Sequence, residues 1–287
     1  MKRFFLVTFS GLMVAGLFAQ GVNQKLQKAF RQFESDAQLK HAISSLYVID
    51  AKTGKVVFDK NSQIGLAPAS TQKIITSVTA FELLGKDYRY KTKFGLSENN
   101  ENPNLYIIPS GDPTFGSSRW ESTKEKNILD RIIRALNVAN ASKLESILIS
   151  AEGWNSEQIP DGWIWQDIGN YYGAGAGPLN WQENQFDLLL NSGNKIGDMV
   201  EIVGTEPDLY SYKIYSLASS ASKGSGDNAY IYLPAGHTNG IIRGTIPVNE
   251  NHFVISGAMP DPGSQFIETL KDSLKNKFNL KIGRAHV

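Results

Sequence analysis

The stretch from Leu66 to Gly85 constrains the fold of this 287-residue chain more than any other part of it. It contains a loop with Pro68, then Ser70-Thr71-Gln72-Lys73, and then an apolar run that stops at Gly85. Proline before a helix and glycine after it are typical of helix ends, so the stretch predicts a helix that begins at Ser70. Its apolar residues lie around much of the circumference, which predicts a helix buried inside a domain.

Ser70 and Lys73 are three residues apart and therefore share one face in the first turn of the predicted helix. Backbone N–H groups lack intrahelical partners there, and the helix dipole is positive. A serine becomes a nucleophile when a neighbouring base takes its proton, and a desolvated lysine can be that base. The pair predicts nucleophilic catalysis, with a capping serine beside a surface lysine as the alternative.

Two further Ser-x-x-Lys strings occur, Ser192 to Lys195 and Ser220 to Lys223. Both lie in Gly- or Ser-rich sequence without a buried helix after them. We interpret them as solvated loop residues.

Composition excludes several other classes of function. A formal net charge of +1 without a basic run argues against nucleic-acid binding. The chain has no cysteine, which excludes disulfides and thiolate metal sites. His41, His237 and His252 have no helical pairing for a metal, and His286 lies in a tail that we interpret as non-native, so neither a metal nor a cofactor is expected.

Residues 1–19 are predicted to be a secretory signal peptide. Lys2-Arg3 precede the apolar run from Phe4 to Phe18, and Ala19-Gln20-Gly21 supplies the small residues of a cleavage site. The run is short for a membrane span, and an uncleaved anchor is the alternative.

The order of the other elements predicts an α+β chain, and its length allows two domains or one domain with a large insertion. A strand hairpin precedes the Ser70 helix, and a strand–helix–strand segment follows it. A Gly- and aromatic-rich loop comes next, then a β-rich portion and a last helix that begins near Pro262. The expected strands are 45–50, 55–59, 88–95, 105–108, 144–149, 186–190, 199–203, 210–215, 228–233 and 252–255, the helices 22–39, 128–136 and 266–278, and the loop 159–181.

Ser70-Thr71-Gln72-Lys73 with its flanks is similar to the nucleophile motif of the penicillin-binding proteins and serine β-lactamases. Four further motifs follow it: Gly111-Asp112-Pro113-Thr114, Trp163-Ile164-Trp165-Gln166-Asp167, Gly226-Asp227-Asn228-Ala229-Tyr230 and Ile255-Ser256-Gly257-Ala258-Met259-Pro260-Asp261-Pro262. In this order they make residues 42–280 resemble the penicillin-binding protein 4 type of D-Ala-D-Ala carboxypeptidase/endopeptidase.

The resemblance implies an α+β (α/β) fold: an incomplete β-lactamase/transpeptidase-like catalytic domain with a large inserted α/β and β-rich domain. The implied limits are 20–95 for the first part of the catalytic domain, 96–258 for the insertion, 259–281 for a helix returning to the catalytic domain, and 282–287 for a non-native tail.

The resemblance also implies acyl transfer on cell-wall peptidoglycan in the periplasm. Ser70 would attack the carbonyl between two D-alanines or at a D-alanyl cross-link, Lys73 would take its proton, and water would release the acyl-enzyme. The Ser70 N–H would be one oxyanion-hole donor. Asp167 would contact the amine of the diamino acid, with a capping or loop aspartate as the alternative. Stem peptides are the expected partners, β-lactams would acylate Ser70, and Trp163 and Trp165 are interpreted as packing residues.

Two motifs of that family, Ser-x-Asn and Lys-Thr-Gly, are not found downstream of Ser70. Lys52-Thr53-Gly54 lies upstream in the predicted hairpin turn, and in Ser225-Gly226-Asp227-Asn228 the serine is one residue too far from the asparagine. We therefore expect a C-terminally truncated, inactive fragment. Sequencing past Lys281 tests this expectation, which a stop codon there would contradict.

Two other functions remain open. A β-lactamase- or esterase-like serine hydrolase would share the nucleophile, and rates on penicillin and on D-Ala-D-Ala peptides would separate the two enzymes. A non-catalytic cell-wall-binding protein of the same fold would not react with penicillin at Ser70.

Overall fold

The computed structural model describes residues 21–98, 102–141, 143–154, 157–234, 236–278 and 282–286. The chain divides into two compact units, Met1–Asp87 (unit 1) and Tyr88–Val287 (unit 2). The predicted signal peptide lies outside the described residues, and the predicted domain limits remain proposals. No helix in the described part of the chain is both long and apolar enough to cross a membrane.

Unit 1 has a small aromatic core. Its elements are a helix over residues 21–34, η1 (Ala37–Leu39), β1 (Leu46–Ile49), β2 (Val56–Lys60), η2 (Ala69–Thr71) and α2 (Gln72–Leu84). The predicted hairpin is confirmed, with Val48 opposite Phe58. Phe58 and Phe30 are buried, and their ring centroids lie 5.7 Å apart, so this contact holds the first helix on the hairpin.

Helix α2 is exposed, which corrects the prediction that it is buried. None of its residues is buried, and the exposed fraction is 65% for Ile74, 68% for Ile75 and 80% for Leu83. A helix that is apolar on several faces is buried only where other elements cover those faces, and the described elements of unit 1 do not cover them. Gly85 ends the helix with a φ of 80°, so the predicted helix end is confirmed.

The first core of unit 2 combines a four-stranded sheet with two helices. The sheet has the order β13-β5-β4-β3, and β3 pairs antiparallel with β4 while the other pairs are parallel. The strands are β3 (Lys93–Leu96), β4 (Leu105–Ile108), β5 (Leu144–Ile149) and β13 (Ile282–His286); the helices are α3 (Glu125–Val138) and α5 (Pro262–Phe278). Ile132 of α3 and Phe266 of α5 are buried in one apolar cluster with Ile107 of β4.

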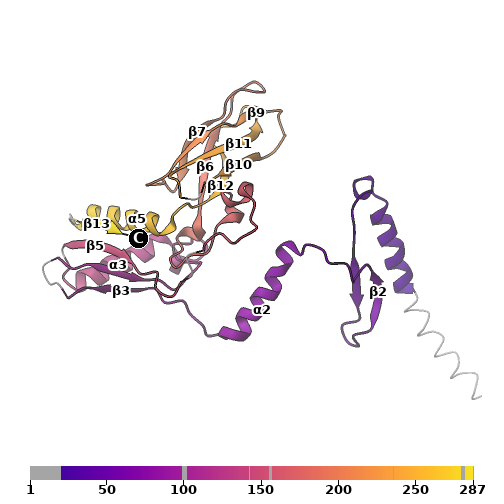
Figure 1. The fold of residues 1–287 in the computed structure, drawn as a ribbon, viewed down its shortest axis with the longest axis horizontal. Coiled ribbons are helices and arrows are strands. Elements are labelled where there is room, and N and C mark those ends of the chain that lie inside the picture. The colour runs from indigo at the N-terminus through magenta and orange to yellow at the C-terminus, as the bar shows by residue number, and fades with distance from the viewer. Residues whose placement is uncertain are drawn as a thin grey trace, which may run out of the picture. The chain divides into compact units, whose positions relative to one another are not determined.

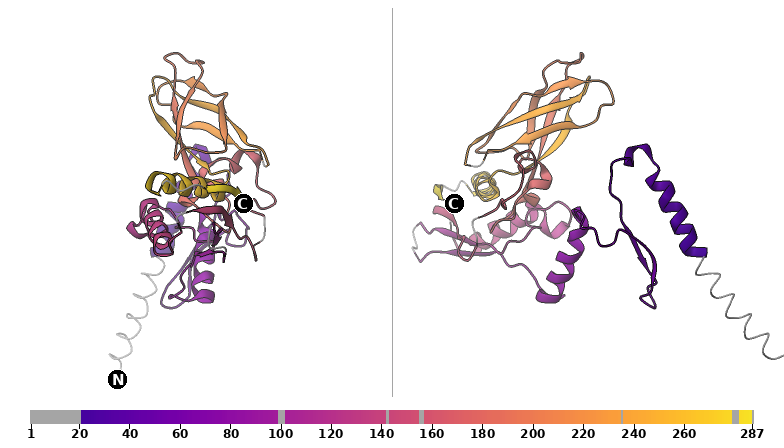
Figure 2. Two further views of the ribbon diagram at one scale, coloured as in Figure 1. Left: turned by 90° about the vertical axis from the view of Figure 1, so that its left-hand side faces the viewer. Right: turned by 45° about the vertical axis from the view of Figure 1, so that its right-hand side comes forward.

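The second core of unit 2 lies between two sheets. One has the order β12-β6-β7; the other has β10-β11-β8, with β9 also beside β11. The strands are β6 (Gln185–Asn191), β7 (Glu201–Glu206), β8 (Lys213–Ser216), β9 (Ser219–Ala221), β10 (Asn228–Tyr232), β11 (Asn239–Pro247) and β12 (Phe253–Ala258). Leu188 of β6 and Ile242 of β11 are fully buried in the same cluster, as in a β-sandwich. Figures 1 and 2 show these strands gathered apart from α3 and α5.

Candidate active site

Ser70 lies in the short turn η2 that leads into α2. The Pro68 carbonyl accepts hydrogen bonds from the Thr71 N–H, at 3.1 Å, and from the Thr71 hydroxyl. Ala69 has a φ of 45°, which non-glycine residues rarely adopt and which is often found at functional sites. The turn therefore fixes Ser70 at the N-terminal end of the helix.

The side chains of Ser70 and Lys73 are in contact, as their spacing predicted. Lys73 Nζ donates a hydrogen bond to Ser70 Oγ at 3.1 Å, and both residues are exposed. The first turn of α2 contains no acidic residue that would offset the positive potential of the helix end. The distance between the two side chains suits proton transfer from a nucleophile to a base, but Lys73 is not desolvated here as the predicted burial of the helix would have made it.

The other two Ser-x-x-Lys strings have structural roles. Ser192 Oγ accepts a hydrogen bond from the Glu250 N–H at 2.8 Å, and Ser220 Oγ accepts one from the Gly193 N–H at 3.0 Å. Ser220 is only 1% exposed and lies in β9, so its interpretation as a solvated loop residue is wrong. Its hydroxyl holds a loop to the sheet.

Lys52-Thr53-Gly54 forms a turn, as predicted. The Asp50 carboxylate accepts hydrogen bonds from the Lys52 N–H, the Thr53 N–H and the Thr53 hydroxyl. The Thr53 hydroxyl is the main cause that lowers the pKa of Asp50. These hydrogen bonds use the backbone and the Thr53 hydroxyl to close the hairpin turn.

Asp167 lies in unit 2, in the short helix α4 (Trp165–Ile168), and is half-buried. Burial first, and then the nearby Asp167 carboxylate, raise the pKa of Tyr172. A Cβ on Gly173 would lie 2.1 Å from the Asp167 carbonyl oxygen, so the chain passes very close to α4. The Tyr172 side chain is therefore a neighbour of the Asp167 carboxylate, and sequence spacing gave no signal for it.

Trp165 is 47% exposed, and one part of its ring packs against Tyr232 and Arg243, as predicted for a residue that holds this loop. Its ring centroid lies 5.0 Å from that of Tyr232, and the Arg243 guanidinium lies 5.8 Å from the Trp165 centroid and 5.4 Å from the Tyr232 centroid. Such contacts fasten α4 to strands β10 and β11. The packing role of Trp163, which is 39% exposed, stays a prediction.

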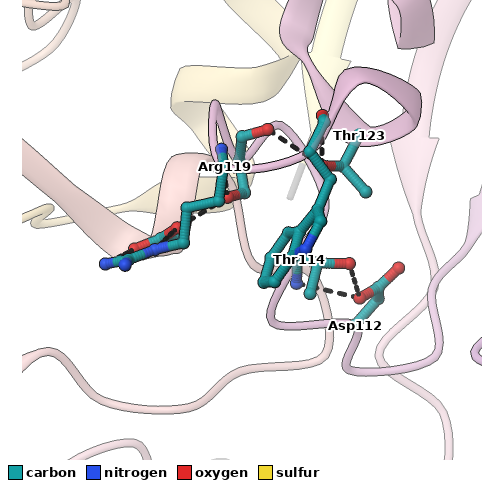
Figure 3. A network of polar contacts seen from close by, with 7 residues as sticks. Asp112, Thr114, Arg119 and Thr123 are labelled. Atoms are coloured by element: carbon teal, nitrogen blue, oxygen red, sulfur yellow. Dashed lines mark hydrogen bonds and ion pairs between the residues drawn. The ribbon is translucent and has the colours of Figure 1, made fainter.

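The motif Gly111-Asp112-Pro113-Thr114 forms a tight turn in unit 2. Asp112 Oδ1 accepts hydrogen bonds from the Thr114 N–H at 2.8 Å and from the Thr114 hydroxyl at 2.7 Å (Figure 3). Gly111 has a φ of 72°, and a Cβ there would lie 2.5 Å from the Trp154 ring. Glycine is therefore required for both conformation and space.

Three consecutive non-glycine residues of unit 2, Gln182, Glu183 and Asn184, have φ between 50° and 60°. Left-handed backbone of this kind costs about 1–2 kcal/mol per residue, so tertiary contacts must hold it. The Glu183 carboxylate accepts hydrogen bonds from Arg119 Nε at 2.6 Å and Nη2 at 3.0 Å, and from the Ser117 hydroxyl at 2.6 Å. This network stabilises the turn between the two cores of unit 2.

The Arg119–Glu183 ion pair predicts that unit 2 is more stable at neutral pH than in acid. Arg119 lowers the pKa of Glu183, so the stabilisation is present above the unfolded-state value of about 4.3 and is lost as pH falls through the folded-state value. The effect is small because the Arg119 side chain is 66% exposed. Urea unfolding should show that Glu183→Gln lowers the free energy of unfolding at neutral pH but not near pH 2. The exposed control Glu201→Gln should change neither value, and equal losses for Glu183→Gln at both pH values would contradict this role of the pair.

Solved structures show the same fold. Penicillin-binding protein 4 (dacB) of Haemophilus influenzae matches with a TM-score of 0.62 at 18% identity, over 83% of this chain and 52% of that chain. The same protein complexed with a β-lactam matches with a TM-score of 0.53 at 17% identity. At these identities the likeness shows the mixed α+β fold alone.

The chain belongs to the D-Ala-D-Ala carboxypeptidase 3 (S13) family, whose match covers residues 25–287. The D-alanyl-D-alanine carboxypeptidase of Actinomadura sp. (strain R39) is 23% identical over 231 residues, 78% of this chain and 39% of that protein. The penicillin-sensitive carboxypeptidase A of Dictyostelium discoideum is 25% identical over 160 residues, 49% of this chain and 28% of that protein. The match to this family confirms the resemblance. The chain spans well under half the length of these two relatives.

Proposed function

We propose that the complete protein is a serine-type D-Ala-D-Ala carboxypeptidase/endopeptidase that acts on peptidoglycan stem peptides in the periplasm. The 3.1 Å contact between Lys73 Nζ and Ser70 Oγ, in a chain of this family, supports the proposal. Lys73 takes the hydroxyl proton as Ser70 Oγ attacks the carbonyl of the penultimate D-alanine. The terminal D-alanine leaves with a proton on its nitrogen, and water then hydrolyses the ester and restores Ser70.

The rest of the reaction centre is proposed to come from outside these 287 residues. The Ser70 N–H would be one oxyanion-hole donor; the second donor, the Ser-x-Asn motif and the Lys-Thr-Gly motif would come from the remainder of the protein. Loss of a single donor costs about 10²–10³ in rate, so the 287-residue chain is expected to show no useful turnover. Measurable release of D-alanine from a pentapeptide by this chain would contradict that expectation.

Asp167 is proposed to bind the side-chain amine of the substrate's diamino acid. A hydrogen bond to a charged group is worth about 1.5–3 kcal/mol, so Asp167→Asn is expected to lower kcat/KM of the complete protein roughly 10- to 150-fold. In a comparison peptide this amine is acetylated, and Asp167→Asn should leave kcat/KM for that peptide unchanged. Asp161→Asn, an exposed residue of the same loop, is the control. Equal losses on both peptides would count against amine recognition.

Labelling of the complete protein with a fluorescent penicillin tests the proposed function. The wild-type protein and the control Ser77→Ala are expected to be labelled, and Ser70→Ala is not. A well-folded complete protein that is never labelled would favour a non-catalytic cell-wall-binding protein. Faster turnover of penicillin than of D-Ala-D-Ala peptides would favour a β-lactamase-like hydrolase.

A further inference from the structure

A cleft in unit 2 that contains neither Ser70 nor Asp167 lies between helix α3 and strand β3, the edge strand of its sheet. Its volume is about 680 Å³, within the range of small-molecule sites. Ile128, Ile132 and Leu136, one helical turn apart on α3, form an apolar wall and are each buried. Leu96 from β3 adds to the apolar lining.

Small side chains on α3 leave this space open. A second row of the helix, Arg131, Ala135 and Ala139, also lines the cleft, and two of its three members are alanines. The helix rises about 16 Å from Ile128 to Ala139, which sets the length available to a linear molecule. A large side chain at position 135 would fill the cleft.

The two ends of the cleft differ in polarity. Lys93, the first residue of β3, pairs with Ile108, the last residue of β4. The residues just before β3 therefore lie at the same end of the cleft as the residues just after β4, which lead to Asp112. The polar lining of the cleft comes from Tyr90, Lys91, Thr92, Asp112, Ser122 and Thr123. Figure 3 shows Asp112 beside Thr114, and it shows Thr123 among the polar contacts of the same region. Leu96 and Leu105, which pair at the other end of these strands, line an apolar region.

The charges that line the cleft favour an anion. Lys91 and Arg131 are exposed and carry two positive charges, against the one negative charge of Asp112. Asp112 Oδ1 already accepts two hydrogen bonds from Thr114. Glu125, in the first turn of α3, offsets part of the positive potential of that helix end.

We propose that this cleft binds a linear amphiphile with one anionic head, the chemistry of a medium-chain fatty acid. The head lies at Lys91 and Arg131, and the chain lies along Ile132 and Leu136. Each buried methylene raises affinity about fourfold, so affinity increases with chain length until the cleft is full.

Calorimetric titration of the 287-residue chain with dodecanoate, below its micelle concentration, tests the proposal. One equivalent binds; Arg131→Ala weakens binding about tenfold, because a hydrogen bond to a charge is lost. Ala135→Phe weakens it at least about tenfold by filling the cleft. Arg134→Ala changes neither affinity nor stoichiometry, because Arg134 carries the same charge on the same helix outside the cleft. Dodecylammonium binds more weakly than dodecanoate.

Helix α2 also exposes apolar side chains, so Ile75→Ser is a second control and leaves dodecanoate binding unchanged. Loss of binding in Ile75→Ser but not in Ala135→Phe overturns the proposal. Three further results would overturn it. They are equal affinity for dodecylammonium and dodecanoate, binding only to anionic lipid vesicles, and no binding of dodecanoate by a chain that circular dichroism shows to be folded. If Ala135→Phe does not fold, Ala139→Leu makes the same test further along the helix.

Discussion

Replacing Ser70 by alanine in the complete protein is expected to lower kcat/KM for D-alanine release by at least about 10⁴-fold, because the oxygen that forms the acyl-enzyme is removed. Lys73→Ala is expected to cost a similar factor, since its Nζ contacts the attacking oxygen at 3.1 Å. A coupled assay for free D-alanine measures both. Ser77→Ala, an exposed residue of the same helix, is the control and should keep the wild-type rate.

The double variant separates a functional pair from two independent residues. If Ser70 and Lys73 act as a unit, the double variant loses no more kcat/KM than Ser70→Ala alone, because Lys73 has no function once the Ser70 oxygen is gone. Costs that add, or a Lys73→Ala protein that keeps most of its rate, would mean that another group takes the proton.

The second large effect is expected on stability. Trp181 is fully buried, and its ring centroid lies 4.7 Å from that of Phe266 and 5.4 Å from that of Phe115. Trp181→Ala should therefore lower the free energy of unfolding of unit 2 by about 3–5 kcal/mol, through lost burial and the cavity it leaves. Urea unfolding followed by circular dichroism measures the loss. Trp120→Ala, at a position 53% exposed, is the control; a loss for Trp181→Ala as small as the control's would contradict a central role for this cluster.

Local features of the fold were predictable from the sequence. The contact between Ser70 and Lys73 follows from their spacing of three residues once the helix forms. Strand β5 has the predicted limits, because four of its six residues are apolar and Ile147, Leu148 and Ile149 follow one another without a break. The hairpin of β1 and β2 was marked by its turn, which Asp50 closes.

Features that depend on distant contacts were missed. Strand β11 was not predicted because Gly240, Gly244 and Pro247 interrupt its β-branched pattern. The left-handed turn from Gln182 to Asn184 contains no glycine, and its contacts with residues such as Arg119 come from far away in the sequence. The exposure of α2 could not be predicted either, because burial depends on elements other than the helix itself.

The most direct test of the central claim is to identify the residue that penicillin acylates in the complete protein. Digestion after reaction with benzylpenicillin, followed by mass spectrometry, should find one adduct per chain, on the peptide that contains Ser70 and Lys73. The adduct should be absent from Ser70→Ala and present in Ser77→Ala. An adduct on another serine, such as Ser192 or Ser220, or a folded complete protein without any adduct, would contradict the assignment of Ser70 as the nucleophile.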